Sequence, residues 1–363
     1  MRLTLDKVAS STRNAGVGKN VVVGPEIPAR AGQVVAVRVL DDKDRYNQLE
    51  TPEGRMATVH RGDRIVGVLG SRRALRGYTG VVPDSVRPGD VLHLLNLGGV
   101  IGRCTSWAPE VGPPARVEVL GAVLSFPDPD TRRGVPASIT PGPVPLLDEL
   151  PGLPPLVLVA GTCMHAGKTA AACRLVRAAT DRGLRVAVAK VTGVALRRDS
   201  LEMLDHGAVS AVTFADAGLP STCSGDAVAA ARGCMAAAAA SEPDLLVVEL
   251  GDGLLGDYGV DAILADPQVQ SATSAVVLAA NDPVAAWGGV QWLSRWNHAT
   301  TVVTGPATDN LAGAQQIATQ TGVAAHNART DTARFVEVVL ERVARPAVPL
   351  SWTGAQGATV GAT

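Results

Sequence analysis

Residues 161–169 read GTCMHAGKT, and they organise the second half of the chain. The stretch is glycine-rich and ends in Gly-Lys-Thr, as phosphate-binding loops of the type G-x-x-x-x-G-K-[ST] do. An apolar run, PLVLVAG, precedes it, and a helical pattern, KTAAACRLVRAATDRG, follows it. This order lets backbone N–H groups and the positive end of a helix face an anion. We therefore predict a nucleotide-binding loop; the alternative is a glycine-rich turn that happens to precede a helix.

Two residues of this loop have defined tasks in such a site. Lys168 would reach the terminal phosphates, and the hydroxyl of Thr169 would bind magnesium. The residues predicted to contact the nucleotide are Gly161, Thr162, His165, Ala166, Gly167, Lys168, Thr169 and Ala170. Because the chain has no guanine-binding N-K-x-D motif, the expected nucleotide is ATP, with Mg²⁺ as its metal.

Short apolar runs alternate with longer helical stretches after residue 155. Such runs are typical of strands that crossover helices bury on both faces. We predict a P-loop α/β domain with a mostly parallel sheet over residues 156–345. The tail, 346–363, has little to bury and is predicted to be flexible.

The first part of the chain has a different pattern. Residues 1–125 form short β segments split by turn residues such as Arg-Pro-Gly-Asp, which predicts a small all-β domain, either a barrel or a sandwich. Residues 126–155 are so rich in proline that we interpret them as an interdomain linker that wraps one surface.

Two further apolar runs end in charged residues. The run AKVTG (189–193) places Lys190 at the carboxyl edge of the predicted sheet, where open α/β folds bind ligands, and a lysine buried there needs an anion such as phosphate or a substrate carboxylate. The run VVELGDG (247–253) brings Glu249 and Asp252 to the same edge. These carboxylates would hold magnesium or position a nucleophile, although Asp252 could instead cap a turn.

A predicted helix after AKVTG adds one more carboxylate, Asp199. It is either a metal ligand or, together with Ser200, a helix N-cap. The candidate catalytic residues are therefore Lys168, Lys190 and Asp252, and the candidate metal ligands are Thr169, Glu249 and Asp199.

The order GTCMHAGKT, AKVTG and DLLVVELGDGLLGDYGV resembles the dethiobiotin synthetase family over about residues 155–310. That family shows a G-T-x-x-x-x-G-K-T loop, a strand ending in K-P-x-x-[ST]-G, and an apolar strand followed by E-G-A-G-G. It belongs with cobyrinic acid synthetase to the MinD-like (SIMIBI) branch of P-loop proteins. The resemblance implies that Lys168 contacts phosphate and that Lys190 contacts the phosphoryl group or a substrate carboxylate. It also implies magnesium at Thr169 and Glu249, and a homodimer.

The chain also departs from the dethiobiotin synthetase pattern. Val191 stands where the family has proline, and Asp252 adds a carboxylate to a run that is normally small and neutral. The family lacks a large N-terminal β domain, so we do not predict biotin synthesis.

Composition narrows the classes of partner. With 33 basic and 34 acidic residues the net charge is −1, which gives no reason to expect nucleic acid or an anionic membrane. The N-terminus lacks the apolar core of a signal peptide, and the five cysteines contain no C-x-x-C pair. We expect a cytoplasmic protein that acts on a small molecule.

One basic cluster stands out in the first unit. LGSRRALRGYTG (69–80) gathers Arg72, Arg73 and Arg76 in one loop. This loop is either solvated or binds an anionic substrate or the nucleotide.

Two functions fit these patterns best. In the first, a Mg-ATP-dependent ligase or kinase phosphorylates a small carboxylate or carbamate so that an amine can displace phosphate. In the second, a nucleotide-hydrolysing switch or cofactor-insertion NTPase acts on a protein partner through the β domain. Switches that load metal centres usually present Cys or His clusters, and the sequence shows none at convincing spacing. A silent nucleotide-gated binding protein is a third hypothesis.

Overall fold

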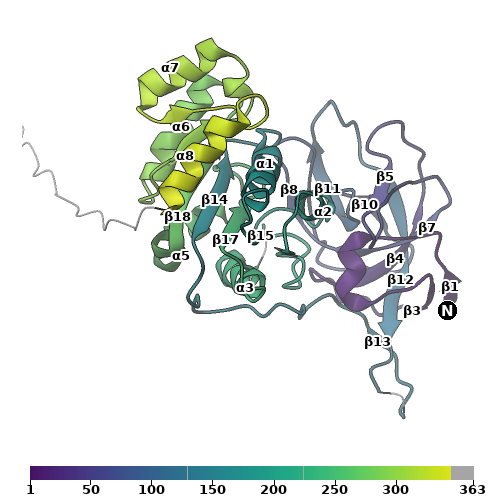
Figure 1. The fold of residues 1–363 in the computed structure, drawn as a ribbon. Helices are drawn as coiled ribbons and strands as arrows, with labels where there is room; N and C mark the ends of the chain where they lie inside the picture. The colour runs from purple at the N-terminus through teal and green to yellow at the C-terminus, as the bar shows by residue number, and fades with distance from the viewer. Residues whose placement is uncertain (129, 224, 345–363) are drawn as a thin grey trace, which may run out of the picture.

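The computed structural model describes residues 1–128, 130–223 and 225–344, which form a β-rich N-terminal unit and a C-terminal α/β unit (Figure 1). The predicted flexible tail, 346–363, lies outside the described residues. Within the described ranges, no helix is both long and apolar enough to span a bilayer.

The N-terminal unit is built on a closed barrel. Strand β4 (Val34–Val39) pairs antiparallel with β7 (Arg64–Leu69) and with β12 (Arg116–Ser125). Strand β10 (Val91–Leu94) pairs antiparallel with β12 and with β11 (Val100–Trp107), and β11 pairs parallel with β7, which closes the ring. The predicted all-β domain is therefore confirmed, and of the two predicted forms it is a barrel.

Shorter elements surround the barrel. They are β1 (Arg2–Thr4), β2 (Lys7–Val8), the 3₁₀ helix η1 (Ser10–Ala15), β3 (Asn20–Gly24), β5 (Gln48–Glu50), β6 (Met56–Thr58), β8 (Arg72–Arg73), β9 (Tyr78–Val81) and β13 (Val135–Pro136).

Alternation along the barrel strands separates two apolar clusters, because successive side chains of a strand point to opposite faces. Val35 and Val37 of β4 belong to a cluster confined to the N-terminal unit. The intervening Ala36 belongs to a second cluster, which also contains Ala195 and Phe214 of the α/β unit. One barrel face is therefore part of the interface between the two units.

The α/β unit contains a parallel sheet with strand order β16-β15-β17-β14-β18-β19-β20. The strands are β14 (Leu156–Gly161), β15 (Val186–Lys190), β16 (Ser210–Thr213), β17 (Leu245–Glu249), β18 (Thr273–Ala279), β19 (Val302–Thr304) and β20 (Ala324–Ala325). The helices are α1 (Lys168–Thr180), α2 (Arg198–Asp205), α3 (Ala227–Ala239), α4 (Val260–Ala265), α5 (Pro267–Ala272), α6 (Pro283–Ser294), the 3₁₀ helix η2 (Pro306–Thr308), α7 (Leu311–Thr321) and α8 (Thr332–Ala344).

Helices cover both faces of this sheet, as the continuous apolar runs predict. Leu156 and Leu158 of β14 pack in one cluster with α3 and α6, whereas Val157 and Val159 pack in another with α1 and α8. The predicted fold class, a P-loop α/β domain joined to a small all-β domain, is confirmed.

The proline-rich segment, residues 126–155, contacts both units. Its strand β13 pairs with β12, and Ile139 is fully buried. Further on, the backbone N–H of Leu147 donates to the carbonyl of Ala229 on α3 at 3.1 Å. Figure 1 shows this segment running from the barrel along the α/β unit to β14.

The loop before β11 is packed directly against the α/β unit. The Asn96 amide donates to the carbonyl oxygen of Ala195 at 2.6 Å. A Cβ on Gly98 would lie 1.9 Å from the same oxygen, so this contact leaves no room for a side chain.

We expect Gly98→Ala to lower the free energy of unfolding by about 1–3 kcal/mol, because the added methyl group must push the two units apart. Urea unfolding of the purified variant measures the loss. The control is Gly18→Ala, where a Cβ would meet nothing within 4 Å. If the two variants unfold at the same urea concentration, Gly98 is not packed as tightly against the α/β unit as described.

Candidate functional site

The phosphate loop connects the central strand β14 to α1, as the sequence predicts. Gly167 caps α1 with a left-handed backbone (φ 97°), which favours glycine. Five residues separate Gly161 from Gly167, one more than in G-x-x-x-x-G-K-[ST]. Thr162 therefore stands where that pattern has its first glycine, and only the longer pattern G-T-x-x-x-x-G-K-T matches the loop throughout.

Lys168 folds back onto the loops around it. Its ammonium donates to the carbonyl of Cys163 at 2.9 Å and to the carbonyl of Asp252. Its side chain is nearly fully buried, and burial lowers the pKa of Lys168 although Glu249 opposes that shift. A bound triphosphate would have to take the place of these two backbone acceptors.

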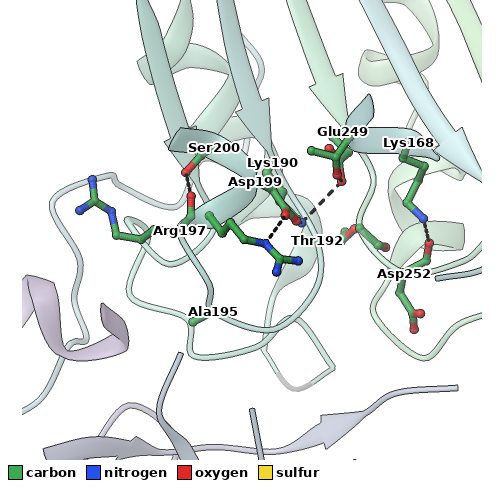
Figure 2. A network of polar contacts seen from close by, with 12 residues as sticks. Lys168, Lys190, Thr192, Ala195, Arg197, Asp199, Ser200, Glu249 and Asp252 are labelled. Carbon is green, nitrogen blue, oxygen red and sulfur yellow. Dashed lines mark hydrogen bonds and ion pairs between the residues drawn. The ribbon is translucent and has the colours of Figure 1, made fainter. Parts of the chain in front are cut away.

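Lys190, Glu249 and Asp199 meet at the carboxyl ends of β15 and β17, which are neighbouring strands (Figure 2). The Lys190 ammonium pairs with Asp199 and lies 3.5 Å from Glu249 Oε1. Burial alone would lower the pKa of Lys190, but the two carboxylates outweigh it and the pKa lies above its ordinary value. The lysine is therefore charged, and it neutralises two buried acids.

The predicted metal ligands lie around the same point. The Thr169 hydroxyl donates to Glu249 Oε1 at 3.2 Å. Asp199 is joined to Glu249 by Lys190, whose ammonium contacts both carboxylates. Asp199 does not cap α2, and Ser200 instead donates its hydroxyl to the carbonyl of Arg197. The alternative interpretation of Asp199 and Ser200 as a helix cap is therefore wrong.

Oxygen ligands of this kind suit magnesium. Glu249 is 1% exposed, and its Oε2 has no hydrogen-bond partner among the described residues. Mg²⁺ typically takes one or two carboxylates and completes its shell with phosphate and water oxygens. No group of three or more His, Cys, Asp or Glu side chains in the described ranges could hold a metal. The residues present therefore fit a nucleotide-bound Mg²⁺ rather than an all-protein metal site.

Asp252 lies apart from these groups. Its backbone is left-handed (φ 66°), and both carboxylate oxygens are buried without a hydrogen-bond partner in the described part of the chain. Burial raises the pKa of Asp252 to about 6, against the opposing charges of Lys168 and Arg72. In Figure 2 the side chain points away from Glu249 and Lys190. Asp252 therefore belongs to a different part of the site from the predicted metal ligands.

A cleft of about 770 Å³ brings these residues together, and both units line it. From the α/β unit it is lined by His165, Gly167, Lys168, Thr169, Ala170, Lys190, Asp199, Glu249 and Asp252, among others. The other predicted loop contacts, Gly161, Thr162 and Ala166, do not line it. Thr162 instead faces α6, where a Cβ on Gly289 would lie 3.1 Å from its methyl group.

The barrel unit supplies the opposite wall, which includes Tyr46, Arg72, Arg76 and Asn96. Arg72 is 3% exposed, and its guanidinium donates to the hydroxyl of Tyr46 at 2.6 Å and to the carbonyl of Leu95. Its Nε has no partner among the described residues. Of the predicted basic cluster, Arg72 and Arg76 reach the cleft, whereas Arg73 pairs with Asp257 outside it. The sequence singled out this loop but could not place it opposite the phosphate loop.

Comparisons with known proteins give only remote similarities. No protein-family model matches the chain, and no curated protein matches it. Similar solved structures include the signal recognition particle 54 kDa protein from Aeropyrum pernix K1 in complex with GDP, with 19% identity and a TM-score of 0.36 over 54% of this chain and 50% of that one. The chain therefore spans about half the length of that structure.

Two others are the signal recognition particle receptor FtsY from Elizabethkingia anophelis in complex with GDP (13% identity, TM-score 0.37, 56% of this chain and 68% of that one) and a DUF1611 family protein from Anabaena variabilis ATCC 29413 (19%, 0.33, 55% and 61%). Similarities this remote carry no functional argument. The P-loop assignment depends on the strand, loop and helix described above, and the finer resemblance to dethiobiotin synthetase stays a prediction.

Replacing Asp252 by Asn should stabilise the empty protein at pH 8. The folded-state pKa of about 6 lies above the ordinary 3.8, so the ionised carboxylate destabilises the fold as pH rises through 6. We expect Asp252→Asn to raise the melting temperature at pH 8 and to raise it less at pH 5. Asp84→Asn, at an exposed position, is the control and should change the melting temperature equally at both pH values. If Asp252→Asn also changes the melting temperature equally at pH 5 and pH 8, the interpretation of Asp252 as a buried acid is contradicted.

Replacing Lys190 by Met should destabilise the protein by about 3 kcal/mol, because it leaves the buried Glu249 without its ion pair and leaves Asp199 only the longer contact with Arg198 at 3.8 Å. Millimolar Mg²⁺ should restore part of this loss by taking the place of the ammonium. Thermal melts with and without MgCl₂ measure both effects. In the matched control Lys7→Met, which breaks the pair with Asp63, Mg²⁺ should restore nothing.

Proposed function

We propose that the protein is a Mg-ATP-dependent enzyme that activates a small carboxylate or carbamate by phosphoryl transfer. The observation that carries this proposal is the shared cleft, in which the phosphate loop faces Arg72 and Arg76 of the barrel unit. The barrel side of the cleft carries two arginines and one carboxylate, Glu110, so its charged side chains are mainly basic and leave room for a second, anionic reactant beside the nucleotide. Proteins that only bind and hydrolyse a nucleotide have no need of such a second half-site.

The residues divide into two sets under this proposal. Lys168 and the loop N–H groups would hold the terminal phosphates of ATP, and Lys190 would neutralise charge on the group in transfer. Thr169, Glu249 and Asp199 would hold Mg²⁺, which neutralises charge on the phosphate oxygens when it is bound. Positioning and charge neutralisation supply most of the acceleration in reactions of this kind.

The proposed reaction has two balanced steps. A carboxylate oxygen of the substrate attacks the γ-phosphorus, the bond between that phosphorus and the β–γ bridging oxygen breaks, and ADP leaves with its electron pair. An amine nitrogen then attacks the carbonyl carbon of the acyl phosphate and displaces inorganic phosphate. Asp252, with a pKa of about 6, could accept the proton that the amine loses at neutral pH.

A nucleotide-hydrolysing switch is a second candidate, and one observation favours it. The carbonyl of Asp252 accepts a hydrogen bond from Lys168. The segment that follows Asp252 also contacts the barrel, because the Tyr258 hydroxyl accepts a hydrogen bond from the backbone N–H of Arg73 at 3.0 Å. Displacement of Lys168 by a nucleotide could therefore reach the barrel unit. A small-molecule partner, a homodimer and a cytoplasmic location remain predictions.

ADP release from ATP should require a small molecule. We expect fractions of a metabolite extract to stimulate it and Lys168→Ala to reduce it at least about 100-fold. Lys7→Ala, on the barrel away from the cleft, should keep full turnover. Turnover that needs no small molecule but rises with a protein partner would favour the switch, and so would a preference for GTP over ATP.

A further inference from the structure

Glu50 is a fully buried carboxylate that does not line the cleft. It ends strand β5 of the barrel unit, but its hydrogen bonds go to the other unit. Its two oxygens accept from the backbone N–H groups of Arg197 and Arg198, each at 2.7 Å. These two N–H groups belong to the start of α2, so a carboxylate from the barrel unit caps a helix of the α/β unit.

Helix α2 has no cap of its own. The first N–H groups of a helix need acceptors, and the residue that precedes α2, Arg197, makes no side-chain cap hydrogen bond. An anion at this end is also favoured by the helix dipole. Glu50 therefore satisfies two donors that would otherwise be buried and unpaired, because its 0% exposure leaves no water to replace it.

The turn that follows Glu50 extends the contact. The β5–β6 hairpin, residues 48–58, also accepts the Arg197 guanidinium at the carbonyl of Pro52. At the tip of the hairpin, a Cβ on Gly54 would lie 2.2 Å from Leu201 Cδ1 of α2. Three separate contacts thus fix the first turn and the second turn of α2 against the barrel.

The first turn of α2 also carries Asp199, which pairs with Lys190 inside the cleft. Asp199 is the next residue after Arg198, whose N–H group Glu50 binds. The position of the carboxylate in the cleft therefore depends on where the hairpin holds the start of the helix.

We infer that Glu50 is a positioning residue for Mg²⁺ binding, acting through α2 on Asp199. The inference rests on the proposed function, because it takes Asp199 as a ligand of nucleotide-bound Mg²⁺. It also gives the barrel unit a task at the nucleotide site besides its substrate wall.

The test measures ATP binding to the full chain by calorimetry at increasing Mg²⁺ concentrations. We expect Glu50→Gln to shift the half-saturating Mg²⁺ concentration upward by about tenfold, the size typical of groups that orient a metal ligand. ATP binding without Mg²⁺ should not change. The matched control, Glu118→Gln, removes a barrel carboxylate that pairs with Arg38, and it should leave the titration unchanged.

The Asp199→Asn variant tests whether Glu50 affects Mg²⁺ binding by positioning Asp199. If Glu50 acts through Asp199, Glu50→Gln should add no further shift in the Asp199→Asn background. A full extra shift there would overturn the inference, and so would a Glu50→Gln titration equal to that of Glu118→Gln. Failure of the wild-type protein to bind ATP with Mg²⁺ would instead contradict the proposed function.

A second variant keeps the inference testable if Glu50→Gln does not fold. Gly54→Ala keeps the Glu50 charge but strains the left-handed backbone of the hairpin tip (φ 90°), which lies against Leu201, and it should shift the Mg²⁺ titration in the same direction. Melting temperatures report folding separately. A folded Gly54→Ala protein with a wild-type titration would also overturn the inference.

Discussion

The charge of Lys190 is the constraint on which the site depends. Two carboxylates, Asp199 and Glu249, reach the end of a sheet whose strands are apolar, and Lys190 is the cation that contacts both of them. The ammonium group satisfies both and ties β15, β17 and α2 to one another. Because Thr169 shares an oxygen of Glu249, the start of α1 joins the same network. The geometry of the phosphate loop and that of the acidic residues are therefore set together.

The barrel is part of this construction. Its apolar outer face packs against the α/β unit, and its loops form one wall of the cleft. Contacts such as Asn96 with Ala195 and Glu50 with α2 are hydrogen bonds between buried groups, which fix orientation more strictly than apolar packing does. The two units therefore act as one framework, and neither would present the complete set of cleft residues alone.

The sequence predicted the parts of the fold that local pattern determines. Apolar runs gave the parallel sheet, and charged residues at run ends gave Lys190, Glu249 and Asp252 as cleft residues, because parallel strands bring their carboxyl ends to one edge. It could not predict Glu50 or the burial of Arg72. Their partners lie 147 and 23 residues away along the chain, and no periodicity encodes such pairings.

The internal hydrogen bonds of Lys168 bear on how readily the loop receives a ligand. An ammonium group in water must shed part of its hydration shell before it can bind phosphate, and this desolvation costs free energy. Here folding has already removed that water and replaced it with two backbone carbonyls. Ligand entry becomes an exchange of one set of oxygens for another, so the affinity of the loop depends on how easily the carbonyls of Cys163 and Asp252 release the lysine.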